Sequence, residues 1–267
     1  VVCICVCAMS RVSALLILTA LAALAQSAKV KIKIPNLPLP SYIGQGCKYN
    51  DPNLNECVVR KGRPAVKQLA NGDPKYRIPT LDPLVIENLR VDQGTRQVGL
   101  SLECRNCSMY GLQNINFIKA RVDLNNSHCE WDFTLDKMEM RGKYNVSGQV
   151  LILPITGSGD ANITATGVKF SYKYDWILER RANGLDYVKV TTHSLPFTVT
   201  RLHIHLDNLF NGDRLLGDNM NIFLNENWQE IMKDLTPALS DALGEVFKQT
   251  LTSMADLIPF QTLFPKD

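Results

Sequence analysis

The nine residues Leu151–Gly159, LILPITGSG, end in the Gly-x-Gly pattern of a phosphate-binding loop. A dinucleotide-binding loop needs a third glycine, in the order G-x-G-x-x-G, between a strand and a helix. Asn162 stands where that glycine should be, and the stretch that contains it, ANITATGV, alternates like another strand. We therefore predict that Gly157 and Gly159 form a turn between antiparallel strands and bind no nucleotide.

The histidines and serines do not form a recognisable catalytic or metal-binding motif. The chain has four histidines and no G-x-S-x-G sequence of the kind that holds a hydrolase nucleophile. His203 and His205, in RLHIHLD, would project from one face of a strand, but a metal site needs a third ligand and no His or Cys nearby offers one. His128 and His193 have no evident partner. We predict a non-catalytic protein without a cofactor or a metal, with His203 and His205 facing solvent.

The first residues resemble a secretory signal peptide. An arginine precedes the apolar run VSALLILTALAALA, and small residues follow it. We expect residues 1–27 to be removed after Ala25 or Ser27, with Met9 as the start and residues 1–8 as a non-native or untranslated leader. A membrane anchor is the alternative, but the run is nearer 14 than 20 residues. We expect a secreted, extracellular protein.

Residues 28–267 are long enough for a substantial core, and their continuous patterning fits one elongated domain as well as two, with no linker visible inside the stretch. The net charge of +3 is mild, and the basic clusters are short and lack interleaved aromatic residues. These features argue against nucleic acid as a partner.

Five cysteines follow the leader, in a compartment where disulfides persist. Cys47 and Cys57 enclose a polar, turn-like stretch, which predicts a local bridge worth on the order of 2–3 kcal/mol. Cys104 and Cys107 form one C-x-x-C, but a zinc site needs a second pair and a redox motif needs a βαβ unit. We expect one of these two cysteines to bridge to Cys129, which leaves one buried thiol.

Four Asn-x-Ser/Thr sequences lie in the middle of the chain. Together with a signal peptide they predict N-glycosylation at Asn125, Asn145 and Asn162. Asn106 is the least suitable of the four sites because it precedes a cysteine that is expected to be bridged.

Strand patterns fill the chain from about Val91 to His205. Because no helical period interrupts them, hairpins and short turns must join them, and the sheet must be largely antiparallel. Trp131, Phe133 and Leu135 would lie on one face of their strand, which meets apolar material. The predicted strands are VGLSLEC, FIKARVDL, CEWDFTL, KMEMRGKYNV, QVLILPI, ANITATGVKFSYKYDW and LDYVKVTTH.

The C-terminal third predicts a long helix from Asn225 to Ile258 with a wide apolar face, the mark of a helix covered on more than one side. At about 1.5 Å per residue it would span roughly 50 Å. Pro237 either kinks this helix or begins a second one capped by Thr236. Two ordinary amphipathic helices on a sheet are the alternative. A shorter helix is expected around Leu54–Leu69.

The sequence resembles the insect takeout and juvenile-hormone-binding proteins of haemolymph and sensory tissue. The likeness rests on the pair Cys47 and Cys57, on IPTLDPLVIENL, on YNVSGQVLILPITGSG, and on DNLFNGD followed by FLNENW. It covers nearly the whole chain after the leader and implies that residues 28–267 form a single domain. The additional cysteines depart from the takeout pattern, which leaves their pairing open.

The resemblance implies an α+β fold in which a strongly curved antiparallel β-sheet is rolled around one long C-terminal α-helix and encloses an elongated apolar tunnel. Any single candidate for the tunnel wall has plain core packing as its alternative role. The candidates are Trp131, Phe133, Met138, Met140, Leu151, Leu153, Phe170, Tyr172 and Trp176 on strands, and Trp228, Ile231, Leu235, Leu239 and Phe247 on the helix.

Two functions follow from these expectations. The first is a secreted carrier of a hydrophobic small molecule, such as juvenile hormone, another terpenoid or a fatty-acyl lipid, in haemolymph or sensory fluid. The second is a secreted lipid-surface or protein-interaction module of the same fold that delivers no ligand. A cavity would favour the first, and an exposed apolar patch without a cavity would favour the second.

Overall fold

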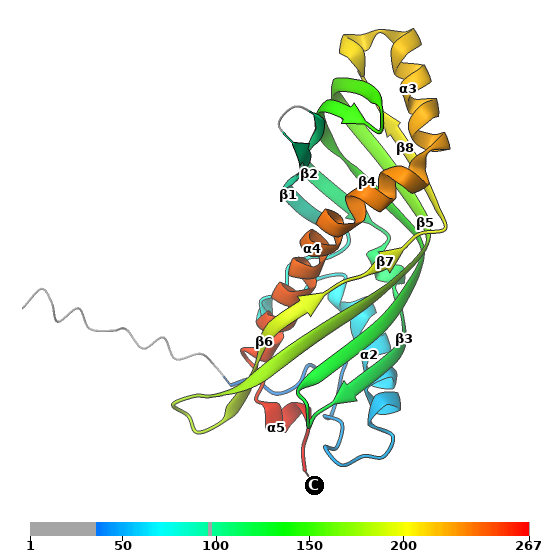
Figure 1. Cartoon of the computed structure of the whole chain (residues 1–267). Coiled ribbons are helices and arrows are strands. Elements are labelled where there is room, and N and C mark those ends of the chain that lie inside the picture. The colour runs from blue at the N-terminus through cyan, green and yellow to red at the C-terminus, as the bar shows by residue number, and fades with distance from the viewer. Residues whose placement is uncertain (1–35, 96–97, 267) are drawn as a thin grey trace, which may run out of the picture. The chain divides into compact units, whose positions relative to one another are not determined.

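The computed structural model describes residues 36–95 and 98–266 (Figure 1). The predicted signal peptide, residues 1–27, lies outside the described residues. From Asn36 onwards the chain forms one unit.

Within the described residues, eight strands form one sheet, in which the strand order is β1-β2-β4-β5-β6. In addition, β3 pairs with β4, and β7 and β8 pair with β5. Every pairing is antiparallel, as the sequence predicts. The strands are β1 (Leu84–Thr95), β2 (Val98–Tyr110), β3 (Asn116–Asp123), β4 (His128–Val150), β5 (Leu153–Arg180), β6 (Asp186–Ser194), β7 (Phe197–Thr198) and β8 (Arg201–Leu206).

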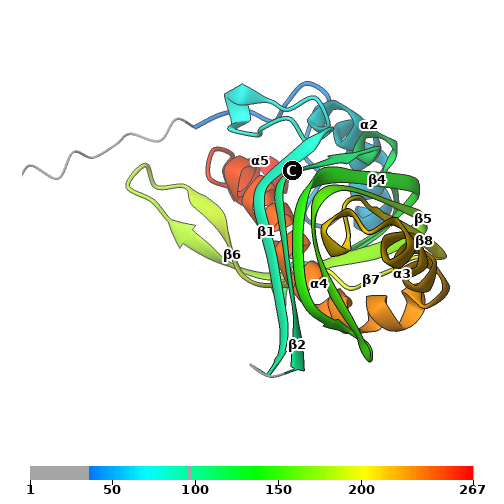
Figure 2. The same cartoon turned by 90° about the horizontal axis from the view of Figure 1, so that it is seen from above.

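The two longest strands, β4 and β5, determine the form of the sheet. They contain 23 and 28 residues and pair from Val150 and Leu153 at the turn to His128 and Asp175. Seen from above, the strands curve around a long helix (Figure 2). The strongly curved sheet implied by the resemblance is therefore confirmed. The sequence divides β4 into two strands, CEWDFTL and KMEMRGKYNV, whereas the structure has one.

The prediction that Gly157 and Gly159 form a turn is wrong. The chain reverses at Leu151 and Ile152, directly after β4 ends, and the φ of Leu151, +56°, lies in the left-handed region. Both glycines lie inside β5, where they allow another segment to approach the strand. A Cβ atom on Gly157 would lie 2.9 Å from the Cα of Leu209, and one on Gly159 would lie 2.6 Å from the carbonyl oxygen of Asp207.

The side chains alternate between the two faces of the sheet, as expected for strands with one covered face. On β4, Phe133 and Leu135 are 5% and 2% exposed, whereas Asp136 is exposed. The inner face of β5 carries Ile155, Ala165 and further buried residues. The apolar inner face thus lies on the concave side of the sheet.

In the described residues, the helices are α2 (Leu54–Leu69), α3 (Arg214–Glu226), α4 (Trp228–Ala255) and α5 (Phe260–Leu263), and three single 3₁₀ turns lie at Pro74–Tyr76, Leu112–Asn114 and Phe210–Gly212. The bounds of α2 match the predicted helix. None of the helices in the described part of the chain is long and apolar enough to cross a membrane.

The long helix α4 lies along the concave face of the sheet (Figures 1 and 2). It contains 28 residues, which at 1.5 Å per residue is about 42 Å. Pro237 lies inside it on an exposed position, so no second helix begins there. Thr236 does not cap a helix, because its hydroxyl donates a hydrogen bond to the carbonyl oxygen of Met232 in the preceding turn.

The shorter helix α3 covers the edge of β8 through two asparagine side chains. The Oδ1 atoms of Asn225 and Asn221 accept hydrogen bonds from the backbone amides of Ile204 and Leu206, each at 2.9 Å. Their Nδ2 atoms donate to the carbonyl oxygens of the same two residues. An edge strand that would otherwise expose its backbone is thereby paired.

The cysteine pairing differs from the prediction at one point. Cys47 pairs with Cys57 and Cys104 with Cys107, each with a Cα–Cα distance of 6.0 Å. The prediction that Cys104 or Cys107 bridges to Cys129 is wrong, and Cys129 is a buried free thiol. Cys104 pairs in the sheet with Tyr144, fifteen positions from Cys129 along β4. At about 3.3 Å per residue, that separation is far beyond the reach of a disulfide.

A hydrogen bond of Tyr144 attaches β4 to the segment that follows β8. Its hydroxyl donates to the carbonyl oxygen of Asp207 at 2.6 Å, and burial raises its pKa to about 12. Tyr144→Phe removes this buried bond, and we expect it to lower the free energy of unfolding by about 1–2 kcal/mol in urea denaturation. Tyr110→Phe is the control, because Tyr110 is 38% exposed and contacts Arg141 through its ring. Equal effects of the two substitutions would contradict this role.

Candidate functional site

A cavity of about 510 Å³ lies between the concave face of the sheet and the helices. Its wall is formed by inner-face residues of β1, β2, β4, β5 and β8, by α4, by α2 and by the segment around Cys47. Along β4 the lining residues run from Trp131 to Val150, and along β5 from Ile155 to Tyr172. The cavity therefore follows the central hairpin over most of its length.

The wall is almost entirely apolar. Lys61 is the charged residue among the lining residues, and Gln45 and Thr250 are the polar ones apart from tyrosine and tryptophan. The Lys61 ammonium group is already hydrogen-bonded within the protein, because it donates to the carbonyl oxygens of Gln45 and Gly46. Such a wall favours an apolar occupant and offers no cluster of groups for proton transfer.

Helix α4 shows why the space is not filled. Its middle residues Leu235, Leu239, Leu243 and Phe247 are apolar, yet they are only half-buried. All four line the cavity. The part of each side chain that no other residue covers therefore faces the cavity. The apolar stripe that predicts a covered helix is in part the wall of a cavity.

Ten of the fourteen wall residues predicted from the sequence line the cavity. They are Trp131, Phe133, Met138, Met140, Phe170 and Tyr172 on strands, and Ile231, Leu235, Leu239 and Phe247 on α4.

The other four candidates are not among the lining residues. Leu151 is 40% exposed in the β4–β5 turn, and Leu153 follows that turn and packs against the edge of the core. Trp176 is buried against α5, with its ring centroid 5.3 Å from that of Phe260. Trp228 is the first residue of α4 and is buried in the core. Burial at strand and helix ends cannot be distinguished from cavity lining by periodicity alone.

Sequence reasoning missed the contributions of several elements, among them β1, α2, β2 and β8. The residues concerned include Ala65 and Leu69 on α2, Leu102 and Met109 on β2, and Leu202 and Leu206 on β8. The contribution of β8 could have been predicted from the alternation in RLHIHL. If the histidines of this strand face solvent, its leucines must lie on the inner face of the sheet. Nothing in the sequence of α2 indicates that it closes the cavity.

A row of aromatic rings stiffens one part of the wall. The ring centroids of Phe117 and Phe133 are 4.8 Å apart, those of Phe133 and Phe170 are 5.0 Å apart, and those of Phe170 and Phe247 are 5.5 Å apart. The row crosses β3, β4 and β5 and ends on α4. Such pairs are worth about 0.5–1.5 kcal/mol each beyond the area they bury.

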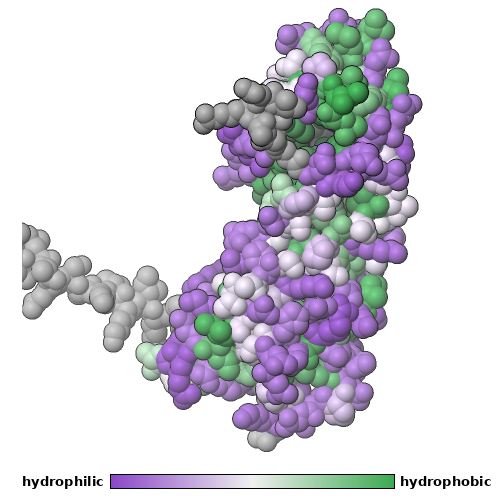
Figure 3. Space-filling model, in the orientation of Figure 1, coloured by the Kyte–Doolittle hydropathy of each residue, from purple (hydrophilic) through white to green (hydrophobic). Residues whose placement is uncertain are grey.

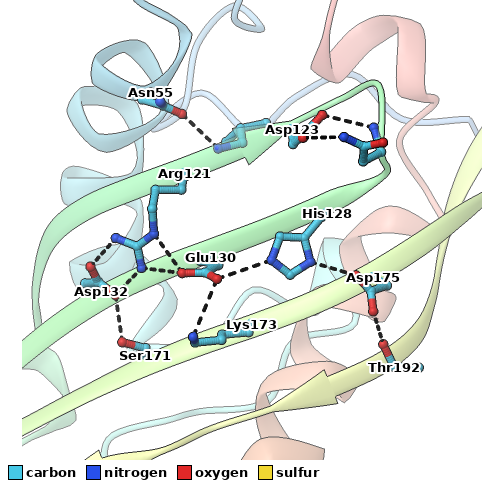
Figure 4. Close-up of polar contacts among 12 residues, drawn as sticks. Asn55, Arg121, Asp123, His128, Glu130, Asp132, Ser171, Lys173, Asp175 and Thr192 are labelled. Atoms are coloured by element: carbon cyan, nitrogen blue, oxygen red, sulfur yellow. Dashed lines mark hydrogen bonds and ion pairs between the residues drawn. The ribbon is translucent and has the colours of Figure 1, made fainter.

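On the outer face of the sheet, a network of charged side chains joins β3, β4, β5 and β6 (Figure 4). The Arg121 guanidinium donates to Asp132 at 2.6 and 2.8 Å and to Glu130 at 2.7 Å. The hydrogen bonds from Arg121 lower the pKa of Asp132 to about 2. None of these residues lines the cavity.

The expectation that His128 lacks a partner is wrong. Its Nδ1 lies 2.6 Å from Asp175 and its Nε2 3.4 Å from Glu130, and the hydrogen bond with Asp175 is the main cause of its raised pKa. The nearby Thr192 hydroxyl donates to Asp175 and not to the imidazole. The group is thus an ion-pair network on the sheet surface, in which the hydroxyls of Thr192 and Ser171 donate to carboxylates and not to the imidazole.

The remaining histidines agree with the sequence analysis only in part. His203 and His205 are exposed on β8, as predicted, and His205 lies 3.0 Å from Asp207. His193 has a neighbour that was not foreseen, Glu245, at 3.8 Å. In residues 36–95 and 98–266, no group of three or more His, Cys, Asp or Glu side chains could hold a metal ion.

The surface carries two further features that bear on function. The predicted glycosylation sites Asn125, Asn145 and Asn162 are all exposed. Hydrophobic side chains also reach the surface, among them those over α3 (Figure 3). Leu215 and Ile222 of α3 are 74% and 55% exposed, and Ile152 in the β4–β5 turn is 83% exposed.

Comparisons with known proteins give a consistent result. Residues 16–265 match the family model described as haemolymph juvenile hormone binding protein. The chain is 26% identical over 232 residues to the circadian clock-controlled protein daywake of Drosophila melanogaster, which covers 83% of this chain and 86% of that protein. For daywake of Drosophila yakuba the identity is 25% over 226 residues, with 82% and 85% covered.

Among solved structures, the fold is similar to the crystal structure of Epiphyas postvittana Takeout 1. The TM-score is 0.75 and the identity 24%, and the match covers 83% of this chain and 99% of that chain. This likeness concerns the fold.

The outer network predicts a pH-dependent contribution to stability. Because folding raises the pKa of His128 above its ordinary value of about 6.5, its ion pairs stabilise the protein fully below that value and are lost as the pH rises through the folded pKa. His128→Gln should therefore reduce the free energy of unfolding more at pH 5.5 than at pH 9. The difference should be at most about 1 kcal/mol, since the side chain is 38% exposed.

Urea denaturation at the two pH values measures this difference. His203→Gln is the matched control, because His203 is exposed on β8 and makes no ion pair among the described residues. A larger loss for His128→Gln at pH 9 than at pH 5.5 would contradict the assignment.

Proposed function

Because the chain belongs to the haemolymph juvenile hormone binding protein family, we propose that it is a secreted carrier that binds a hydrophobic small molecule in its internal cavity. The resemblance inferred from the sequence is thus confirmed. The ligand classes that we propose are juvenile hormone, another terpenoid and a fatty-acyl lipid. The observation that carries the proposal is the apolar cavity itself.

The size and chemistry of the cavity fit this role. Its volume of about 510 Å³ falls within the range of about 300–1,000 Å³ that is usual for small-molecule sites. Burying roughly 300 Å² of apolar ligand surface at about 25 cal/mol per Å² would contribute about 7 kcal/mol before the costs of association. No bond needs to be made or broken for the protein to act in this way.

The position of the lining residues supports an elongated tunnel. Leu224 of α3 and Leu263 of α5 both line the cavity. These two helices precede and follow α4, whose length is about 42 Å. We propose that an extended ligand lies parallel to α4, between it and the β4–β5 hairpin.

A second function, a secreted lipid-surface or protein-interaction module, is favoured by one observation. Leu215, Leu216 and Ile222 on α3 and Ile152 in the β4–β5 turn are exposed apolar residues. Such residues are suited to contact a membrane or another protein. The cavity is the stronger feature, because a module that delivers no ligand does not need it.

The carrier function predicts that partly filling the cavity weakens binding. Ala242 on α4 lines the cavity, so the side chain introduced by Ala242→Phe would take up part of the space. We expect this variant to bind the fluorescent probe N-phenyl-1-naphthylamine at least about tenfold more weakly, a loss of about 1.4 kcal/mol. Its melting temperature should not fall by more than a few degrees, since the added ring enters an existing space.

Gln249→Phe is the control, because Gln249 lies on the same helix at an exposed position outside the cavity. It should bind the probe like the wild-type protein. Unchanged probe binding by Ala242→Phe would count against the cavity as the ligand site.

Secretion and glycosylation form a separate prediction. When the chain is expressed in insect cells, we expect it in the medium without residues 1–27 and with sugar at Asn125, Asn145 and Asn162. Asn→Gln at each of these positions should remove one glycan, seen by mass spectrometry before and after glycosidase treatment. Asn106→Gln is the control and should leave the mass of the attached sugar unchanged. Retention of the chain inside the cells would refute this part of the proposal.

A further inference from the structure

Five exposed apolar side chains belong to two elements at one end of the molecule. Leu151 and Ile152 form the β4–β5 turn, and Leu215, Leu216 and Ile222 lie on α3. Figure 1 shows the turn and α3 at the same end. Among the large apolar side chains of the described residues, Ile152 and Leu215 are the two most exposed, at 83% and 74%. We call these five residues the apolar tip.

The two elements of the apolar tip are attached to each other. Gly157, on β5 shortly after the turn, forms a β-bridge with Leu209, which precedes α3. The Nδ2 atom of Asn208 donates a hydrogen bond to the carbonyl oxygen of Ser158 at 2.8 Å. The hairpin and the start of α3 therefore keep a fixed arrangement, and a single flat surface could contact both.

The side chains of the apolar tip on α3 are not those with which the helix packs onto the protein. The buried residues of α3 are Gly217, Met220 and Leu224. Leu215 and Ile222 are seven residues apart, so they lie on one side of the helix, and that side is exposed. A cluster of exposed leucine and isoleucine marks a surface that contacts a partner.

The charge of this end fits a neutral lipid surface. No charged residue lies between Lys143 and Asp160, so the whole end of the hairpin is uncharged. On the first turns of α3, Arg214 and Asp218 have opposite charges. Anionic lipids attract clusters of basic residues, which this end does not carry. An apolar, uncharged surface enters the interface of a zwitterionic bilayer without burying a charge.

A protein partner fits the apolar tip less well. The tip consists of five residues, whereas a stable protein interface usually contains roughly 20–30 residues on each side. All five are leucine or isoleucine. The residues that dominate the binding energy at protein interfaces are tryptophan, tyrosine and arginine, and leucine is under-represented among them. A bilayer needs neither a large matching area nor such anchor residues.

The apolar tip adjoins the cavity. Val150 and Ile155, on either side of the turn, line the cavity, and so does Leu224, two residues after Ile222. When the tip lies in a bilayer, this end of the cavity wall lies close to the lipid. An apolar ligand that leaves the cavity there avoids the unfavourable passage through water.

We propose that the apolar tip inserts into a zwitterionic lipid bilayer and that the ligand is loaded and released at this end of the cavity. The inference rests on the proposed carrier function. It adds the partner with which the carrier exchanges its ligand.

Flotation with phosphatidylcholine vesicles tests the contact. We expect the full-length secreted protein to float with the vesicles, and to do so equally at about 1 M sodium chloride, which screens attraction between charges. In the double variant Ile152→Gln/Leu215→Gln, the bound fraction should fall at least about fivefold, because two apolar side chains become polar. Loss of wild-type binding at high salt would contradict insertion of an apolar surface.

The matched control is the double variant Ile118→Gln/Ile177→Gln. Ile118 and Ile177 are 49% and 52% exposed. They lie on β3 and β5 toward the end of the β4–β5 pair that is opposite to the turn. This variant should float like the wild-type protein, and equal losses in the two double variants would overturn the proposal.

Binding of N-phenyl-1-naphthylamine in the absence of vesicles separates the two claims. None of the four substituted residues lines the cavity, so both double variants should bind the probe like the wild-type protein. A wild-type protein that binds the probe but does not float would overturn this inference and leave the carrier function intact. A wild-type protein that does not bind the probe would overturn the carrier function itself.

Two further measurements decide between the bilayer and a second copy of the chain. In stopped-flow transfer of the probe from protein to phosphatidylcholine vesicles, the wild-type rate should rise with vesicle concentration. The rate of Ile152→Gln/Leu215→Gln should not, because its probe must cross water. Sedimentation should show a wild-type monomer. A dimer that this variant abolishes would assign the apolar tip to a second copy and overturn the proposal.

Discussion

The structure depends on one geometric constraint, which is that a single helix cannot fill the concave face of so long a hairpin. The strands β4 and β5 contain 23 and 28 residues, and their inner faces are apolar throughout. These faces must be removed from water, and the 28-residue helix α4 covers them only in part. The uncovered area surrounds a cavity of about 510 Å³. Binding an apolar molecule completes the burial that the protein begins.

The other elements keep this partly filled interior closed. The asparagine side chains of α3 pair with the edge of β8, and the ion pairs of Arg121 and His128 join β3, β4 and β5 from outside. A hydrogen bond from the Thr192 hydroxyl to Asp175 adds β6 to this network. The disulfide between Cys47 and Cys57 holds the segment before α2 to that helix, which contributes to the wall at the opposite end from α3 (Figure 1). Polar interactions are thus concentrated on the outside, and the inner surface is left for hydrophobic contact.

Local patterns in the sequence predict much of this fold, and contacts between distant residues account for the errors. Period-two alternation indicates the strands, and α2 begins and ends as expected, because these are properties of neighbouring residues. Gly157 and Gly159 resemble turn residues, but the segment at Leu209 needs their small size within β5. The separation of Cys104 from Cys129 depends on the register of β2 and β4, which no local pattern specifies. For the same reason the sequence identifies Trp131 and Tyr172 as wall residues without showing that the indole Nε1 and the phenol oxygen are buried, with no hydrogen-bond partner among the described residues.

Native mass spectrometry of the secreted protein, before and after organic extraction, tests the central claim that the interior is a ligand site. The account predicts a co-purifying molecule that extraction removes, whose chemical class is a terpenoid or a lipid, and an extracted protein that takes up juvenile hormone or a fatty-acyl ester again. A protein that is purified empty and takes up neither compound would contradict the account, and it would favour a role in surface contact through the exposed residues of α3.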